Sequence, residues 1–524
     1  MGKIGDKVKD ICGIEGNTKE TLRPMLNYTC VNITIGGAGY PINQFHQQFL
    51  AFVEGMGTAA AGKISLISGL WDAVSDPVMG IVTDRTRSKN GRHRPYLLVS
   101  AVPFALSYLF KWTSFGISAG GNDKAVWWWY LFAALMYCTF MTIMSIPHTA
   151  MLPTVAPHYF ERTQYKIVEY AMNSVGQVSS YVFTALALSG FNIKTALTAL
   201  PTPSAADRPN YAMVGIVLAL WFSWSPFLCY FKTKEPSSLG QHNEPFDYKY
   251  FFNEYKSVFE NRAFRQYFII SLFYSMSKYF CNYADQYFMV SVTDTYNIFI
   301  SMNIISGIAE FSGSPVNYVI TRYKGKTACG KILGPLMVVG IAANGFLSYG
   351  TPKVIKYIVI VLSAVCYNFG FSGPGFVYEN IEPDVTDVDE LITGRRREGV
   401  ISTFSTFCKK AVSSFMGYAV GQSLEWFGYD PNIKEPKLQK PLTTFGLRLD
   451  YAIIPAILAF FCVLSIFRYT MTKRDHELIK EIIEEKHNTG ECTVSDEEKA
   501  RIEKIAGKKW EDMWIGKPCA VEAE

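Results

Sequence analysis

Long apolar stretches separated by short polar breaks run along most of this sequence. Each stretch has about 20 residues, enough for a helix to cross the hydrocarbon core of a bilayer. Several contain Gly, Pro, Asn or Ser in their middle, as expected of helices that pack closely or line a cavity. We predict an all-α membrane protein with about twelve transmembrane helices. The predicted spans cover residues 26–53, 62–84, 95–116, 125–152, 166–190, 211–232, 265–290, 296–320, 329–349, 353–379, 399–424 and 447–470.

A long polar segment rich in Lys, Glu, Pro and Asn divides these spans into two groups of about six. After the last span the chain becomes charged, with apolar residues at helical spacing, which indicates short surface helices. For this tail we favour a solvated terminus over a regulatory role. The predicted parts are an N-terminal six-helix bundle (1–232), a cytoplasmic linker (233–264), a C-terminal six-helix bundle (265–471) and a cytoplasmic tail (472–524).

The two halves resemble each other over a short segment. The residues from Ser75 to Thr83 align with those from Gly313 to Thr321, and both segments contain a Pro-Val pair near their start. Parallel repeats of six spans build the major facilitator fold, in which the substrate site lies between the halves. The repeat therefore favours that architecture.

The composition agrees with a membrane protein. Of the 524 residues, 49% are hydrophobic and 15% aromatic, whereas only 18% are charged. These fractions disfavour a soluble enzyme of this length. The 11 cysteines are scattered without a CxxC pair or a Cys/His cluster, so we expect no disulfide framework and no metal site built on them. The net charge of +5 gives no support to a nucleic-acid partner.

The basic residues indicate how the chain is oriented. Residues 1–19 are polar and charged without an apolar core, so no cleavable signal peptide is expected. Most short loops that follow an even-numbered span carry Arg or Lys, which by the positive-inside rule places these loops and both termini in the cytoplasm. The lysine-bearing loop 426–446 is an exception. We predict a multi-pass protein of the plasma membrane.

Two carboxylates interrupt the second span. Asp72 and Asp76 lie four residues apart, and each costs roughly 2.5–3.5 kcal/mol near the centre of a bilayer. Their spacing places both on one helical face, where like charges repel unless a cation lies between them. The pattern predicts a cation site inside the membrane. The alternative is a buried pair that forms a salt bridge to a neighbouring helix, with Lys409 as the candidate partner.

The segment around this pair resembles a known family. The sequence WDAVSDPVMG at residues 71–80 is followed by TRSKNGRHRP at 86–95, and this combination is similar to the signature of the glycoside–pentoside–hexuronide:cation symporters, the melibiose permease-like branch of the major facilitator superfamily. The similarity extends to span four, span eleven and the GYDPN segment at 428–432. The resemblance implies a secondary active transporter that couples Na⁺ or H⁺ to the uptake of a sugar, glycoside or uronide. It implies no catalytic residues and no cofactor besides the coupling ion.

The resemblance also implies which residues bind the cation. The two acidic residues of the family's second span correspond to Asp72 and Asp76, and a hydroxyl ligand of span four corresponds to Thr142. Ser75 occupies a position where a relative has Asn and could add a further oxygen. Hard oxygen ligands suit a small hard cation, which would make the two carboxylates metal ligands if the ion is Na⁺. Lys409 matches the lysine of span eleven that lies near both sites in the family, so we expect it to couple them.

The sugar-binding pattern of melibiose permease is not retained. Its acidic residue in span one has no counterpart, the one in span four corresponds to Ser145, and its arginine in span five corresponds to Tyr170. Recognition of a hydroxyl-rich substrate would then fall to other polar side chains of the first, fourth and fifth spans. The candidate substrate-binding residues are Asn43, Gln44, Gln47, Ser145, His148, Glu169, Tyr170, Asn173 and Gln177.

Charged residues in two predicted cytoplasmic loops resemble the superfamily's gating charges. One group follows span two and the other lies between spans ten and eleven. We expect ion pairs that break and re-form during alternating access, although charges placed only to set topology would give the same pattern. The candidate gating residues are Asp84, Arg85, Arg92, Arg94, Asp384, Asp387, Glu390 and Arg396.

Other functions are compatible with parts of the pattern. A carrier of lysolipids or another organic solute would share the aspartate pair, but the Asn- and Gln-rich first and fifth spans disfavour a wide apolar cleft. A non-transporting membrane sensor would need a signalling domain larger than the tail after Thr472. An intramembrane enzyme is disfavoured because no HExxH or GxSxG motif occurs.

Overall fold

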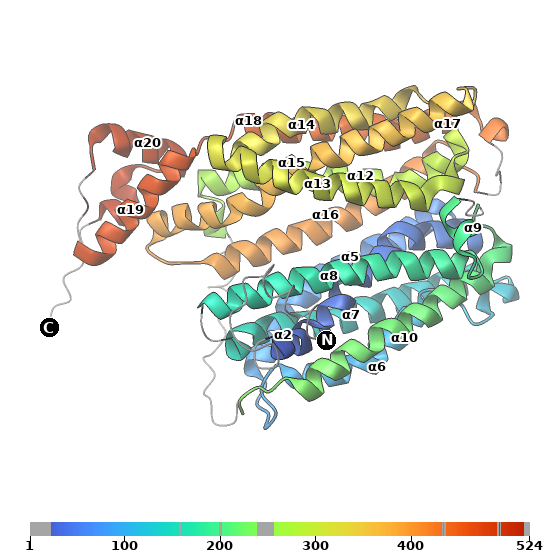
Figure 1. The fold of residues 1–524 in the computed structure, drawn as a ribbon, viewed down its shortest axis with the longest axis horizontal. Helices are drawn as coiled ribbons and strands as arrows, with labels where there is room; N and C mark the ends of the chain where they lie inside the picture. Colours follow the sequence, from blue (N-terminus) through green and yellow to red (C-terminus); the bar gives the residue numbers. More distant parts are fainter. Residues whose placement is uncertain are drawn as a thin grey trace. The chain divides into compact units, whose positions relative to one another are not determined.

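The computed structural model describes residues 22–517, apart from 157–158, 199–201, 238–255, 432, 434–435, 490–491 and 493. Throughout this part of the chain the regular elements are helices, so the predicted all-α fold is confirmed (Figure 1). Each predicted span coincides with one long helix or with a run of shorter ones. The first half contains α2 (Leu22–Thr29), α3 (Val31–Gly37), α4 (Gly39–Pro41), α5 (Thr58–Arg85), α6 (Arg94–Phe110), α7 (Asp123–Val155), α8 (Tyr159–Leu188), α9 (Ile193–Thr198) and α10 (Arg208–Lys232). The second half contains α12 (Arg262–Phe288), α13 (Phe299–Lys324), α14 (Lys326–Ala343), α15 (Lys353–Thr393), α16 (Glu398–Trp426), α17 (Pro441–Arg448), α18 (Ile454–Phe467), α19 (Lys473–Thr489) and α20 (Asp496–Ala506).

Only some of these helices are apolar enough to be identified as membrane spans by themselves. Five helical segments within the described residues meet both the length and the hydropathy expected of a span, namely Asp123–Val155, Ala205–Lys232, Lys326–Phe346, Lys353–Thr393 and Pro441–Phe467. The other long helices carry charged or amide side chains that lower their mean hydropathy, as α5 does with Asp72 and Asp76. Such polar residues are tolerated in a bundle because they face its interior or a water-filled cavity.

The first span is a broken helix. After α4, the chain forms π-helical turns at Ile42–His46 and Phe49–Val53. Wide turns of this kind occur mostly as single-turn insertions and are frequent at functional sites. They change which side chains share a face, so the polar run around Gln47 does not follow one straight helical stripe.

The helices form two compact units. The first comprises residues 1–244, 285–301 and 414–446, and the second comprises 245–284, 302–413 and 447–524. The division passes through α16, whose second half packs in the first unit, where Thr58 Oγ1 donates to the carbonyl of Gly421 at 3.0 Å. The predicted boundaries at residues 232 and 265 therefore remain a prediction.

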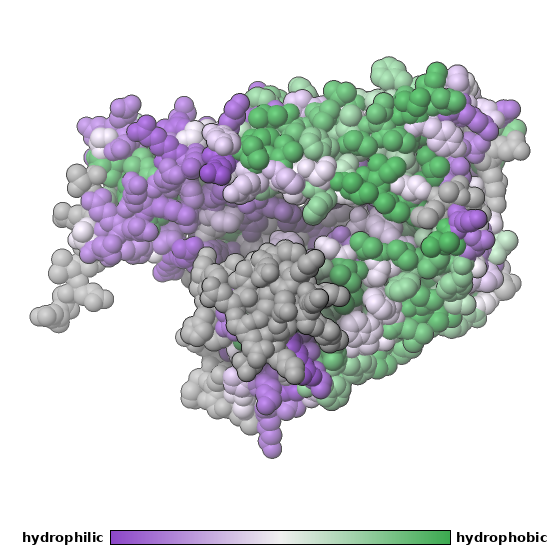
Figure 2. Space-filling model, viewed as in Figure 1, coloured by the Kyte–Doolittle hydropathy of each residue, from purple (hydrophilic) through white to green (hydrophobic). Residues whose placement is uncertain are grey.

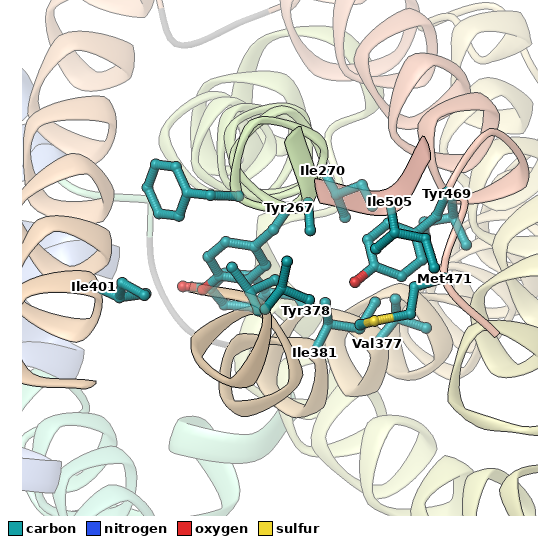
Figure 3. Close-up of a cluster of buried hydrophobic side chains, with 14 of the residues drawn as sticks. Tyr267, Ile270, Val377, Tyr378, Ile381, Ile401, Tyr469, Met471 and Ile505 are labelled. Carbon is teal, nitrogen blue, oxygen red and sulfur yellow. The ribbon is translucent and has the colours of Figure 1, made fainter. Parts of the chain in front are cut away.

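The core of the second unit lies where α12 and α15 meet the C-terminal helices. Tyr267 of α12 stacks on Tyr378 of α15 with ring centroids 5.9 Å apart. Ile270 and Ile505 also point into this cluster, although Ile505 belongs to α20 (Figure 3). On the surface of this unit, hydrophobic side chains cover much of the long helices, whereas α19 and α20 are mainly hydrophilic (Figure 2). The helices α19 and α20 thus expose mainly polar side chains and bury apolar ones in the core of the second unit.

Candidate cation and substrate site

The aspartate pair is held by the packing of α5 against α7. Asp72 and Asp76 follow one another by a single helical turn on α5 and are both half-buried. Trp71, directly before Asp72, donates through Nε1 to Thr139 Oγ1 of α7 at 2.9 Å, and Thr139 lies one turn before Thr142. This bond fixes the register between the two helices and brings Thr142 of α7 opposite the carboxylates.

Thr142 is the centre of the site. Its Oγ1 lies 2.9 Å from Asp76 Oδ1 and 3.3 Å from Asp72 Oδ1. Ser75 Oγ lies 3.2 Å from the same Thr142 oxygen and also 3.1 Å from the carbonyl oxygen of Asp72. The four residues predicted to bind the cation therefore lie together.

This arrangement favours binding of a small cation or a proton. A hydroxyl carries one proton, so Thr142 can donate to only one of the two carboxylates at a time. The like charges repel across a partly buried site, and a cation or proton between them would remove that repulsion. Oxygen ligands from carboxylates and hydroxyls suit a hard ion. Among the residues that the structure describes, no group of three or more His, Cys, Asp or Glu is arranged to hold a metal ion.

Lys409 lies in the first half of α16 and belongs to the second unit. Its Nζ lies 4.2 Å from the ring centroid of Tyr378, which is a cation–π distance. Tyr378 also stacks on Tyr274 of α12 with ring centroids 5.3 Å apart. The lysine is therefore placed over an aromatic stack, and its coupling role stays a prediction because Asp72 and Asp76 belong to the first unit.

The candidate substrate residues of α8 share one side of that helix. Tyr170 is 71% exposed, and Gln177, two turns later, is also exposed. Asn173 lies between them, and within the described residues its buried Oδ1 has no hydrogen-bond partner. Glu169 forms an ion pair with Lys166 at 2.9 Å. This face of α8 thus offers amide and phenol groups in a row.

The other candidates differ in their surroundings. Asn43 is exposed and Ser145 is half-buried, which leaves both accessible to a ligand. Gln44 is buried, and its backbone carbonyl accepts a bond from Gln286 Nε2 at 2.6 Å. Gln47 is also buried and donates through Nε2 to the carbonyl of Gly417 at 3.1 Å.

His148 is occupied by contacts with α2. Its Nε2 lies 3.0 Å from the carbonyl oxygen of Tyr28, and the Tyr28 hydroxyl donates to the His148 carbonyl at 2.7 Å. The two rings also stack, with centroids 4.4 Å apart. Tyr28 was not among the predicted residues, since nothing in the local sequence marks a partner 120 positions away.

The first group of candidate gating residues lies around the loop between α5 and α6, which is held by hydrogen bonds to Glu235. Arg94 Nε donates to the carbonyl of Tyr230 at 2.7 Å, and its amide donates to Glu235 Oε2 at 2.9 Å. The His93 ring lies 2.7 Å from Glu235 Oε1. Arg85 is exposed and Arg92 half-buried, whereas the side chain of Asp84 lies outside the described part.

Glu235 lies so close to Gly91 that position 91 has no room for a side chain. Gly91 has φ +90°, a left-handed conformation that residues with a Cβ rarely adopt, and a Cβ there would collide with the Glu235 carboxylate. The carboxylate accepts backbone amides at the start of α6, where such groups have no partner within the helix. Sequence analysis missed Glu235 because it lies in the polar segment, far from the loop that it holds.

The second group lies at the end of α15 and contacts the C-terminal helices. Asp387 pairs with His476 at 2.8 Å, and Glu390 pairs with His487 at 3.2 Å. Arg396 pairs with Glu398 at 2.6 Å and lies 4.0 and 3.9 Å from Asp387 and Glu390. Asp384 pairs with Lys326 of α14 at 2.6 Å.

Comparison with known proteins identifies the family of this chain. The model of the family described as MFS/sugar transport protein matches residues 27–473. The chain belongs to this family. Members of the MFS/sugar transport family are transporters and not enzymes, and the predicted fold class and transport function are confirmed.

Individual relatives agree with the family assignment. The uncharacterized symporter sll1374 of Synechocystis sp. is 24% identical over 83% of this chain and 91% of its own length. The isoprimeverose transporter of Lactiplantibacillus pentosus is 24% identical over 86% of this chain and 88% of its own length. A partially occluded, inward-open structure of the xylose transporter XylE from Escherichia coli has a TM-score of 0.56 at 10% identity, over 87% of this chain and 98% of that one. That structure supports the fold alone.

In this MFS/sugar transport protein, Glu235→Gln is expected to loosen the loop at residues 86–93. Burial alone would raise the pKa of Glu235, but hydrogen bonds from the His93 ring and from the amides of Arg94 and His93 outweigh it and hold the pKa below its ordinary value. A group with a lowered folded-state pKa contributes stability above its unfolded pKa and loses it as pH falls through the folded one. We expect a loss of about 1–3 kcal/mol in local opening free energy at neutral pH.

Hydrogen exchange of residues 86–93 in the full chain measures this effect. Wild type and Glu235→Gln should differ at pH 7 and converge once the pH falls below the lowered folded-state pKa of Glu235, where the wild-type carboxylate is protonated as well. Glu497→Gln, at an exposed position in α20, is the control and should leave the loop unchanged. An equal difference between Glu235→Gln and wild type at both pH values would mean that the carboxylate charge does not hold the loop.

Proposed function

We propose that this protein is a symporter that couples Na⁺ or H⁺ to the uptake of a glycoside, pentoside or hexuronide across the plasma membrane, with both termini in the cytoplasm. The observation that carries the proposal is the Thr142 hydroxyl within hydrogen-bonding distance of Asp72 and Asp76. The coupling ion would bind among these carboxylate and hydroxyl oxygens, with Ser75 beside them. If the ion is Na⁺, the carboxylates act as metal ligands; if it is H⁺, they share the proton.

Coupling follows from the charge of the empty site. Without a cation, repulsion between Asp72 and Asp76 disfavours the close packing of α5 and α7 around Thr142. Ion binding removes the repulsion and orders these helices, so the substrate binds a site that is already ordered. By linkage, the bound substrate raises the affinity for the ion by the same factor. Lys409 is our candidate for the group that senses both ligands.

The substrate site is proposed on the exposed polar side of α8. Tyr170 and Gln177 are exposed there, whereas the amide oxygen of Asn173 is buried beside Gly36 of α3, so Asn173 is a weaker candidate. Aromatic rings and bidentate amides are the groups that bind sugar faces and hydroxyls. Asn43 and Ser145 are further accessible candidates, whereas Gln47 and His148 make packing contacts and are weaker ones. The charged loops would then open and close access as the two halves alternate.

Uptake by vesicles containing the full chain tests the proposal. A panel of radiolabelled glycosides, pentoses and uronides, with a lysophospholipid as a separate arm, would be offered under an imposed Na⁺ gradient, an imposed pH gradient or neither. We expect at least one sugar to accumulate uphill under only one of the two imposed gradients, and not in the absence of a gradient. Accumulation of the lysophospholipid alone would replace the substrate class, and equal uptake under all conditions would refute coupling.

A further inference from the structure

The C-terminal tail is docked on the end of α15. Ile479 and Ile482 of α19 and Ile502 and Ile505 of α20 are buried in the same core as residues of α12 and α15. Figure 3 shows Ile505 beside this core, which is formed by side chains from distant parts of the sequence. The tail is therefore a folded cap on the second unit and differs from the solvated terminus that the sequence favoured.

Three carboxylates lie under this cap at a place where a helix does not favour them. Asp384, Asp387 and Glu390 follow at three-residue intervals in the last turns of α15, and each is less than 10% exposed. The C-terminal end of a helix carries partial negative charge, and like charges one turn apart repel. Partly buried carboxylates in this position need cationic or hydrogen-bonding partners.

The cap supplies most of these partners from α19. His476 Nε2 lies 2.8 Å from Asp387 and 3.5 Å from Asp384, and Lys480 lies 3.8 Å from Asp387. His487 Nε2 lies 3.2 Å from Glu390. The remaining partners come from outside the tail. They are Lys326 of α14 on Asp384 at 2.6 Å, and Arg396 at 4.0 Å from Asp387 and 3.9 Å from Glu390.

We propose that the tail is a pH-responsive clasp on the junction between α15 and α16. Histidine is the side chain whose charge changes between about pH 5 and 8. When His476 and His487 are protonated, their hydrogen bonds to the carboxylates become charge-assisted and roughly twice as strong. Acidification on the tail side tightens the clasp, and a rise in pH loosens it.

The internal structure of the cap does not share this sensitivity. Arg501 of α20 makes two hydrogen bonds to Asp475 of α19, at 2.9 and 2.7 Å. Burial alone would raise the pKa of Asp475, but the bonds from Arg501 and Thr472 outweigh it and hold the pKa below its ordinary value. Asp475 therefore stays ionised across the neutral range, so α19 and α20 move together when the clasp opens.

The clasp acts on a segment that leads into the membrane. Trp514 of the cap packs against Gly394, the residue directly after α15, and against the His487 ring at a centroid distance of 5.0 Å. Four residues later α16 begins, and this helix carries Lys409. A tight clasp restrains the connection between α15 and α16, and release lets it move.

Hydrogen exchange on the full chain in nanodiscs tests the clasp without any substrate. We expect the protection factors of residues 473–489 and 394–413 to fall together by about tenfold between pH 6 and pH 8, because two charge-assisted bonds weaken at once. The double variant His476→Gln and His487→Gln keeps side-chain donors but not the charge. It should show the low protection of pH 8 at both pH values.

A matched control and two contrary outcomes make the test decisive. Lys499→Gln removes an exposed pair with Asp496 within α20 and should keep the wild-type profile. Protection of residues 473–489 that does not depend on pH in the wild type would refute the histidine clasp. A tail that loosens while residues 394–413 keep their protection would refute its action on the helix junction. Neither outcome bears on the proposed symport, which the uptake experiment tests separately.

Discussion

Asp76→Asn is expected to abolish cation-driven accumulation of substrate. Asparagine keeps an oxygen that can accept a hydrogen bond from the Thr142 hydroxyl, which lies 2.9 Å from Asp76 Oδ1. The substitution removes one of the two negative charges that attract the ion. A hydrogen bond or ion contact to a charged group contributes about 1.5–3 kcal/mol, so cation affinity should fall about 10- to 150-fold. Vesicle uptake under an imposed gradient, with the cation concentration varied, measures this loss.

Substrate exchange at equal concentrations distinguishes lost coupling from lost folding. Asp76→Asn should still exchange labelled for unlabelled substrate across the membrane, because exchange needs no net ion movement. Asp123→Asn is the matched control, since Asp123 is an exposed aspartate in the first turn of α7. Its accumulation should equal that of the wild type. Undiminished accumulation by Asp76→Asn would remove the aspartate pair from the mechanism.

The arrangement of the proposed cation site could be expected from the sequence because its geometry is mostly local. Asp72, Ser75 and Asp76 lie within two turns of one helix, so their spacing alone places them together. Thr142 could not be found by spacing, since it comes from another helix, and it was predicted only through resemblance to a family. The structure brings it within 3.3 Å of both carboxylates.

The candidate substrate-binding residues show a distinction that the sequence pattern does not make. Gln47 and Gln177 are both amides within predicted spans, yet the first is buried against the backbone of Gly417 and the second is exposed on α8. Interruption of the first span by π-helical turns changes the faces of its residues, and no local signal marks where such turns fall. Polar residues that bind a ligand and those that pack helices therefore look alike in sequence.

Contacts between residues far apart in the chain could also not be predicted from the sequence. The apolar spacing of the tail predicted its helices, but not that His476 would meet Asp387, 89 residues earlier. The loop after α15 gives a similar case, because it contains three consecutive arginines. Arg396 was the predicted gating residue, and its side chain is 62% exposed. The side chain of Arg397, next to it, is only 9% exposed.

Arg397→Met is expected to destabilise the second unit by about 3–5 kcal/mol, because it leaves a buried carboxylate without its partner. Arg397 donates two hydrogen bonds to Asp389, at 2.8 and 2.7 Å, and a third to Ser257 at 2.6 Å. The side chains of Arg397 and Asp389 are only 9% and 1% exposed. A lower apparent melting temperature of the full chain in detergent, together with faster hydrogen exchange at the end of α15, would show this loss.

A variant of the neighbouring Arg396 distinguishes the effect of losing a buried ion pair from the effect of losing a positive charge. Arg396→Met removes the same charge one residue earlier. Its close pair with Glu398 is exposed on both sides and its distances to Asp387 and Glu390 are 4.0 and 3.9 Å, so the expected change is below about 1 kcal/mol. The double variant Arg397→Met and Asp389→Leu should recover most of the stability that Arg397→Met loses, because it removes the unpaired charge as well as its partner. If Arg397→Met and Arg396→Met melt at the same temperature, the buried pair does not stabilise this junction. If the double variant is no more stable than Arg397→Met, the loss comes from missing arginine packing rather than from the stranded carboxylate.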